Sequence, residues 1–228
     1  MRSAVAAFLA VAALHAWAEE PARRPNPSRF GPLDVSAPLG FFIDQPHPRW
    51  RTQAADAELA QRALDAWDRA SGGLFCFYRT SASQAAIRIY WGQVGTGLGR
   101  MQTTPLGRGR AGEVYVELSP ERFSPALAER CRQDPLFRDA YVFRTLLHEI
   151  GHALGLVHTV APEDVMYYGG DVLSFYESYR RTLEDRADLA GKPGFSDADR
   201  GQLEKLYFPP AAPAAEKSPA ILSSESAP

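Results

Sequence analysis

The segment His148–His158, which reads HEIGHALGLVH, constrains the fold more than any other part of the sequence. His148 and His152 are four residues apart, so on a helix they lie on one face and can reach the same ion. Gly155 can adopt the left-handed conformation that ends a helix and turns the chain back. His158 then completes a three-histidine site with an open fourth position, as in catalytic zinc sites. The alternative, a surface helix that carries these residues by chance, is disfavoured by the full spacing.

Glu149 follows the first histidine and is expected to project beside the metal rather than onto it. A carboxylate there suits a general base, because zinc makes a water molecule acidic enough to lose a proton near neutral pH. The sequence therefore predicts one catalytic Zn²⁺ held by His148, His152 and His158, with Glu149 as the catalytic base.

The first 18 residues have the organisation of a signal peptide. Met1-Arg2 gives a positive start, residues 4–14 are apolar, and Ala16-Trp17-Ala18 is a small-x-small cleavage pattern. The apolar run is short for a membrane span, and an N-terminal membrane anchor is the alternative. We expect the mature chain to start near Glu19 and to be secreted or periplasmic.

Residues 39–208 have the length and composition of one globular domain. Residues 19–38 hold several prolines among charges and predict an extended, Pro-rich lead-in. Residues 209–228 are rich in Pro, Ala and Ser and predict a disordered tail. The net charge of −2 gives no indication of nucleic-acid binding, and no segment after the first is apolar enough to cross a membrane.

The chain has two cysteines, Cys76 and Cys131. In an exported protein oxidation is the default, so we expect a disulfide that would contribute about 4 kcal/mol by restricting the unfolded chain. The alternative is a free thiol that binds the metal and keeps the site inactive.

Hydrophobic periodicity predicts strands first, interrupted by one helix, and helices afterwards, which is an α+β layout. The expected strands are 40–44, 74–79, 86–91 and 113–118, the last with Val114, Val116 and Leu118 facing inward. The expected helices are 53–70, 125–133, 137–154, 171–189 and 196–207. The glycine-rich stretch 92–112 is interpreted as a loop, because no helix pattern follows it to make a phosphate-binding turn.

The pattern His148-Glu149-x-x-His152-x-x-Gly155-x-x-His158 resembles the signature of metzincin zinc peptidases. Asp164-Val165-Met166-Tyr167 is similar to their Met-turn, and both the offset of Met166 and the hydroxyl residue Thr159 resemble the matrixin branch. Segments between residues 39 and 208 resemble successive parts of a matrixin catalytic domain.

This resemblance implies a zincin-like fold, with a twisted mixed five-stranded sheet, an active-site helix and a small C-terminal helical subdomain. Met166 would form a hydrophobic base beneath the zinc without binding it. Calcium is compatible with the resemblance but has no assigned residues, and Glu113 and Glu117 fit a solvated strand face. No histidine between His47 and His148 is available for a second, structural zinc.

Tyr168 departs from matrixins, which have a proline at that offset, and resembles astacins and serralysins, which have a tyrosine. It is a candidate catalytic residue, because a phenol can donate a hydrogen bond to negative charge developing on the substrate. The alternative is a tyrosine that lines the specificity pocket. The stretch from Tyr168 to Phe195 is also longer than the matrixin link, so its helix would restrict the substrate, dock a partner or act as scaffold.

The sequence therefore predicts a secreted zinc endopeptidase that acts as a monomer. Its expected substrate is a protein or peptide bound in extended form. The substrate would add a strand to the sheet edge near residues 98–103. Two alternatives are an exported zinc-binding module without catalysis and a zinc hydrolase of a non-peptide amide.

Overall fold

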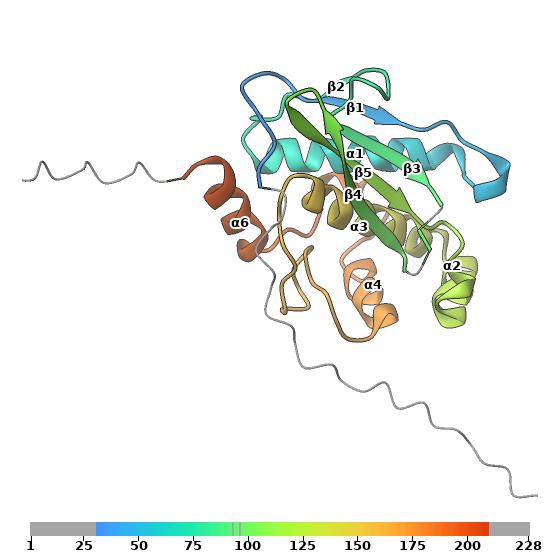
Figure 1. Ribbon diagram of the computed structural model, residues 1–228. Helices are drawn as coiled ribbons and strands as arrows, with labels where there is room; N and C mark the ends of the chain where they lie inside the picture. Colours follow the sequence, from blue (N-terminus) through green and yellow to red (C-terminus); the bar gives the residue numbers. More distant parts are fainter. Residues whose placement is uncertain (1–30, 93, 96, 210–228) are drawn as a thin grey trace, which may run out of the picture.

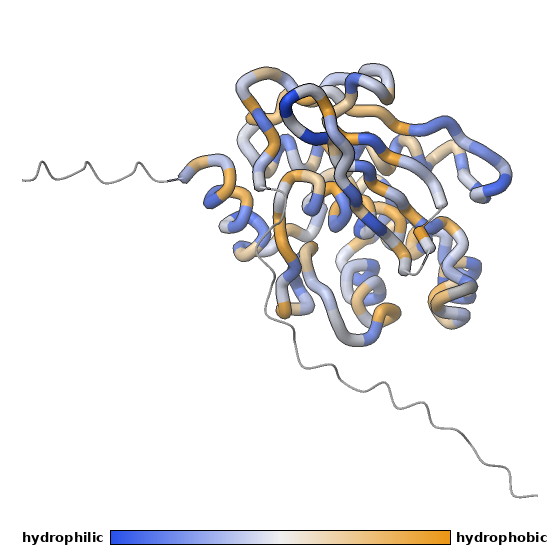
Figure 2. The backbone as a smooth tube through the Cα atoms, in the orientation of Figure 1, coloured by the Kyte–Doolittle hydropathy of each residue, from blue (hydrophilic) through white to orange (hydrophobic). Residues whose placement is uncertain are grey.

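The computed structural model describes residues 31–209, apart from 93 and 96, and forms an α+β fold (Figure 1). The predicted signal peptide, residues 19–30 of the predicted lead-in and residues 210–228 of the predicted tail lie outside the described residues. Apolar and polar residues are interspersed along the strands and helices (Figure 2), and the apolar ones form the buried core.

A mixed five-stranded sheet carries the fold, in the strand order β2-β1-β3-β5-β4. Its strands are β1 (Gly40–Ile43), β2 (Tyr78–Arg79), β3 (Ile87–Trp91), β4 (Gly99–Leu106) and β5 (Gly109–Val116). β1 pairs in parallel with β2 and β3, β3 pairs in parallel with β5, and β4 pairs antiparallel with β5. The predicted mixed five-stranded sheet is therefore confirmed, with β4 at one edge.

The interpretation of 92–112 as a loop is wrong over most of its length, because β4 and the start of β5 form a hairpin there. Leu106 pairs with Gly109, and Gly107 between them has φ +56, a conformation typical of two-residue hairpin turns. Among the glycines that suggested a loop, Gly107 instead serves this turn, and Gly99 and Gly112 serve the close packing described below.

The helices are α1 (Ala54–Ala70), α2 (Pro125–Gln133), α3 (Pro135–Ala153), α4 (Val172–Arg180), α5 (Asp188–Gly191) and α6 (Asp197–Tyr207), with short 3₁₀ turns η1 (Pro48–Trp50) and η2 (Pro120–Arg122). The long helices α1 and α3 pack together, and α3 lies against β4 and β5 (Figure 1). The helix predicted over 171–189 is too long: α4 ends at Arg180, where Thr182 and Leu183 form tight turns with the carbonyls of Tyr179 and Arg180.

The sheet face that meets α3 is apolar, as the alternation of β5 predicts. Val114 and Val116 are fully buried and Leu118 nearly so. Gly112 permits a close approach of the helix, because a Cβ at this position would lie 2.5 Å from the Cβ of Ala153. The outer face is less solvated than predicted, since Glu113 is paired with Arg88 at 3.0 Å and is hydrogen-bonded by Gln102.

Residues 31–38 of the predicted lead-in are anchored to the domain. Leu33 is buried, and its backbone N–H donates to the Tyr207 hydroxyl at 3.1 Å. Arg110 donates to the carbonyl of Gly31 at 2.6 Å and to that of Ala153 at 3.0 Å, which ties this segment to the end of α3.

The predicted disulfide is absent, because Cys76 and Cys131 are both free. Cys76 is exposed in the turn after α1, where its backbone N–H is held by the Asp68 carboxylate. Cys131 is half-buried on α2, and burial raises the pKa of its thiol to about 11. The two cysteines thus lie in separate local environments and do not form a disulfide.

Candidate metal centre

The active-site motif begins inside α3, a helix whose start is well defined. Asp134 caps it by accepting from the backbone N–H of Phe137 at 3.1 Å, and Pro135 occupies the first turn, where its missing N–H costs nothing. The helix ends at Ala153, as the glycine two residues later predicts. Gly155 has φ +101, and a Cβ on it would lie 2.5 Å from the carbonyl oxygen of Gly31, so the turn requires glycine.

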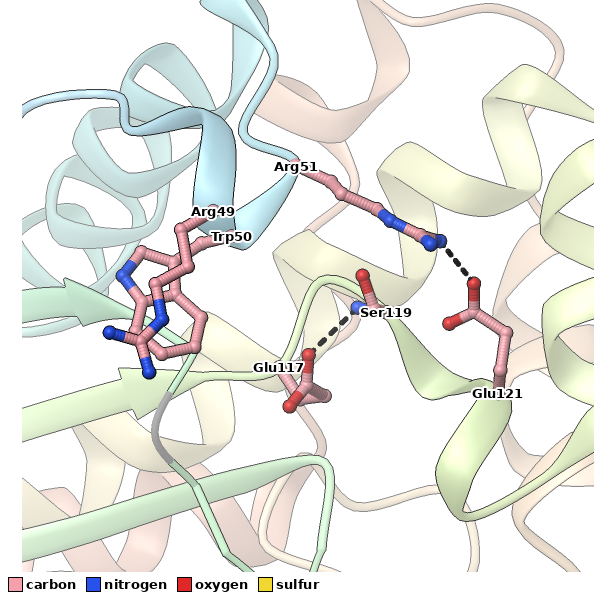
Figure 3. A pocket seen from close by; sticks show the side chains of 6 residues that line it. All are labelled: Arg49, Trp50, Arg51, Glu117, Ser119 and Glu121. Carbon is pink, nitrogen blue, oxygen red and sulfur yellow. Dashed lines mark hydrogen bonds and ion pairs between the residues drawn. The ribbon is translucent and has the colours of Figure 1, made fainter.

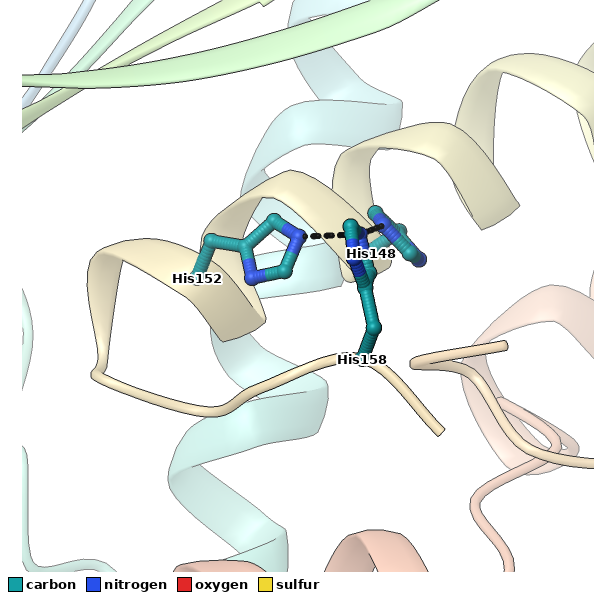
Figure 4. Close-up of side chains that lie close together, drawn as sticks. All are labelled: His148, His152 and His158. Carbon is teal, nitrogen blue, oxygen red and sulfur yellow. Dashed lines mark hydrogen bonds between the residues drawn. The ribbon is translucent and has the colours of Figure 1, made fainter. Parts of the chain in front are cut away.

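This turn brings the three predicted ligands together (Figure 4). The Nε2 atom of His158 lies 2.9 Å from that of His152 and 3.2 Å from that of His148. Three nitrogens that each lie about 2.0–2.1 Å from a tetrahedral zinc ion are roughly 3.4 Å apart. The observed separations are close to this value, so the donor set fits zinc.

Backbone carbonyls orient two of the imidazole rings. The Nδ1 atom of His148 lies 2.8 Å from the carbonyl oxygen of Val165, and that of His152 lies 3.0 Å from the carbonyl oxygen of Leu156. A carbonyl can only accept, so each Nδ1 carries the proton and each Nε2 is left with a lone pair for a metal.

Burial also keeps the three imidazoles in the form that binds metal. It lowers the pKa of His148 well below its ordinary value, aided by the neighbouring His152. Burial likewise lowers the pKa of His152, and it lowers that of His158 to about 4. All three side chains are therefore neutral at physiological pH, and a metal meets no competing proton there.

Glu149 lies on the side of α3 that faces the edge strand. A Cβ on Gly99 of β4 would lie 2.7 Å from Cγ of Glu149 and 2.8 Å from Cγ2 of Thr145, so the strand backbone is in direct contact with this side chain. Burial raises the pKa of Glu149 to about 8. A divalent cation held by the adjacent histidine acts in the opposite direction, because it favours the carboxylate.

The predicted Met-turn lies beneath the histidines. Met166 is fully buried, and a Cβ on Gly151 of α3 would lie 2.5 Å from its sulfur, so this glycine of the motif makes room for the methionine. Thr159, directly after the third ligand, donates its backbone N–H to the carbonyl of Met166 at 2.8 Å. Its own carbonyl accepts from the backbone N–H of Tyr168 at 3.1 Å. The ligand loop and the Met-turn are thus hydrogen-bonded side by side.

Two charged residues support this turn, although the sequence did not indicate that either of them belongs to the site. Asp199, considered only as the helix cap of α6, is buried and accepts from the backbone N–H groups of Val165 at 2.8 Å and Met166 at 3.1 Å. Arg144, one turn before His148, donates to the carbonyl of Asp164 at 2.9 Å. The sequence signal for Asp199 was the capping pattern with Ser196, which the structure confirms.

Tyr168 lies at the exposed edge of the site. Its ring stacks on that of His158, with centroids 4.5 Å apart and planes 17° apart, and the residue is 73% exposed. The predicted candidate is therefore next to the third ligand.

A separate cavity of about 360 Å³ lies just beyond the end of β5, between η1 and η2 (Figure 3). Its lining residues are Arg49, Trp50, Arg51, Glu117, Ser119 and Glu121. Glu117 accepts from the backbone N–H of Ser119, and Arg51 pairs with Glu121. Within residues 31–209, 93 and 96 excepted, the histidine triad is the cluster of side chains arranged to bind a metal, and calcium stays without assigned residues.

Comparison with known proteins agrees with the geometry. The family model of Matrixin, peptidase family M10, matches residues 36–185, about two thirds of the chain. None of the curated proteins compared with the chain matches it. The chain belongs to the matrixin family of zinc metalloendopeptidases, and its zinc site consists of His148, His152 and His158.

Proposed function

We propose that this matrixin cleaves internal peptide bonds of proteins outside the cytoplasm, on a substrate segment laid along β4, with Glu149 as general base. The observation that carries this proposal is the contact between Glu149 and Gly99. It means that the residue next to the first zinc ligand also touches the edge strand of the sheet. A peptide paired with that strand would pass directly over the carboxylate.

β4 is suited to bind an extended peptide because it is an edge strand. It pairs with β5 on one side, and no other strand in the described part of the chain pairs with its outer side. The backbone groups of such an edge can pair with a substrate in the manner of an added strand. This geometry favours a protein or peptide substrate over a compact small molecule.

His148, His152 and His158 would hold the zinc ion, which would supply a Lewis acid for the scissile carbonyl and for a water molecule. Glu149 takes the proton from this water as the oxygen attacks the carbonyl carbon, and then gives the proton to the nitrogen of the departing amine. The low exposure of Glu149 supports this role, because bulk water does not compete for the proton during the transfer.

Tyr168 has a proposed second role, as a hydrogen-bond donor to the substrate oxygen that becomes negative. Its ring stacks on His158, next to the third ligand, and its high exposure leaves it accessible to a bound substrate. A donor in that position stabilises the transition state more than the ground state. Lining of the specificity pocket is the other role open to it.

We further propose that the enzyme acts as a monomer after export. Matrixins are typically extracellular, and the start of the chain has the pattern of a signal peptide. Among the described residues, no helix is long and apolar enough to cross a membrane.

The test uses the chain from residue 19 to 228, loaded with zinc, on an unfolded protein substrate. Cleavage should be lost with a chelator and restored by zinc, and new amino termini should appear at internal bonds. Glu149→Ala should keep zinc but lose cleavage. Full activity in this variant would refute the role of Glu149. Cleavage of non-peptide amides alone would instead favour a different zinc hydrolase.

A further inference from the structure

Tyr176 of α4 packs against α3 beside the catalytic residues. It is 6% exposed, and its ring meets that of Tyr141 edge-on, with centroids 5.0 Å apart. Its hydroxyl lies 2.9 Å from Oγ1 of Thr145. Thr145 has a single hydroxyl proton, which it donates to the carbonyl of Tyr141 at 2.8 Å. The Tyr176 hydroxyl therefore donates to Thr145.

Thr145 is one helical turn before Glu149, so the two side chains lie on the same face of α3. Gly99 of β4 contacts both of them, as the positions of its missing Cβ show. Gly99, Thr145 and Glu149 thus form one corner of the site, and the hydroxyl of Tyr176 reaches this corner through Thr145.

The α4 helix holds this ring firmly in place. Glu177 pairs with Arg130 of α2 at 2.6 Å, and Arg180 pairs with Asp134 at 2.9 Å. The neighbouring ring of Phe175 lies over the guanidinium of Arg144 at 5.0 Å. Moving Tyr176 away would require these contacts to break together.

We propose that Tyr176 is a specificity-determining residue: its ring occupies the space beside Glu149 that a large substrate side chain next to the scissile bond would need. This inference rests on the proposed binding of substrate along β4. Successive side chains of an extended peptide point to opposite faces, so only one of the two residues that flank the bond faces α3. At that position the enzyme favours small residues.

The experiment compares two series of peptides that vary one flanking residue at a time, on the amino or the carboxyl side of the bond, through Ala, Val, Leu and Phe. Tyr176→Ala should raise the ratio of kcat/KM for Leu or Phe over Ala by about tenfold or more, in one series only. Tyr176→Phe, which keeps the ring, should retain the preference for small residues.

Tyr179→Ala is the matched control. Tyr179 is also buried on α4, but its hydroxyl donates to the carbonyl of Lys192 and its ring faces Arg144 rather than Thr145. This variant should lower kcat/KM equally for all peptides. Zinc content and thermal melting identify variants that have lost the fold, and Tyr176→Leu replaces Tyr176→Ala if the latter does not fold.

An unchanged preference in a folded Tyr176→Ala or Tyr176→Leu variant would overturn the assignment of Tyr176. A wild-type enzyme that cleaves no peptide would instead refute the proposed function, so the two failures are distinguishable.

Discussion

Helix α3 is held on two sides by contacts of different kinds. On the sheet side, Gly99 and Gly112 let the strand backbones approach closely enough to touch Glu149 and Ala153. On the opposite side, which we call the loop side (residues 159–199), side chains make the contacts. Arg144 reaches the carbonyl of Asp164, and Asp199 accepts from the Met-turn.

These two kinds of contact support two functions of α3: the sheet side positions the catalytic carboxylate, and the loop side supports the zinc-binding histidines. At Gly99 and Gly112 no side chain separates the strand from the helix, so a larger residue at Gly99 displaces the catalytic carboxylate directly. The loop side holds the histidines through several hydrogen bonds between side chains and backbone. The loss of one of these bonds therefore lowers zinc affinity only in part. We expect sheet-side substitutions to act mainly on kcat and loop-side substitutions on zinc affinity, stability and specificity.

The largest effect is expected for Glu149→Gln, which keeps the shape of the side chain but cannot take a proton. The value of kcat should fall by about 10²–10⁴-fold, with zinc content unchanged, as measured by steady-state kinetics and metal analysis. Glu204→Gln, on the exposed side of α6, is the control and should have wild-type activity. A small loss in Glu149→Gln would mean that another group accepts the proton.

Gly99→Ala tests the sheet side without replacing a catalytic residue. Its Cβ would force Glu149 and Thr145 to move, and a displacement on the order of 1 Å costs about 10²-fold in rate. Gly109→Ala is the matched control in the same hairpin, where the nearest atom to the new Cβ is the carbonyl oxygen of Leu106 at 3.7 Å. Equal kcat values for the two variants would contradict the distinction between the two sides.

Asp199→Asn tests the loop side. The amide keeps one acceptor oxygen but replaces the other by a donor that faces backbone N–H groups. The loss of charged hydrogen bonds should destabilise the fold by about 3 kcal/mol and lower Tm by roughly 6–12 °C. Zinc affinity should fall by about 10- to 100-fold, as for other residues that support a ligand shell. Asp197→Asn, exposed in the same turn, should change Tm little.

Tyr168→Phe should have a smaller effect, a roughly tenfold lower kcat with little change in KM. An exposed hydroxyl competes with water, so its loss costs less than that of a buried oxyanion donor, which is about 10²–10³-fold. Tyr78→Phe, a tyrosine 50% exposed on β2, is the control. A change confined to KM for certain substrates would indicate that Tyr168 lines the pocket.

The two cysteines should differ in reactivity without affecting activity. Because burial raises the pKa of Cys131 to about 11, its thiol stays protonated below that pH. Alkylation of Cys131 at pH 8 should therefore be much slower than that of exposed Cys76, and should speed up roughly tenfold per pH unit as the thiolate fraction grows. Mass spectrometry of the alkylated protein measures both rates. Recovery of a Cys76–Cys131 disulfide would contradict the free thiols.

Spacing within a single helix and its following turn was enough to predict the zinc site. The separation of His148 and His152 and the place of Gly155 involve only neighbouring residues, so local geometry determines them. The apolar alternation of β5 likewise predicted its buried face. Local patterns failed for β4, because its Gly99 is explained only by the packing of α3 against it. They also failed for the cysteines, because pairing depends on where distant segments come to lie.

The sequence by itself determined the metal ligands, the candidate base and the α+β layout, because each depends on residues a few positions apart. Only the tertiary structure decided what surrounds them. The contact of Gly99 with Glu149, the support of the Met-turn by Asp199 and the position of Tyr176 beside Thr145 join residues from separate elements. Hydrophobic packing brings those elements together without leaving a local pattern in the chain, so such contacts become visible only in the folded protein.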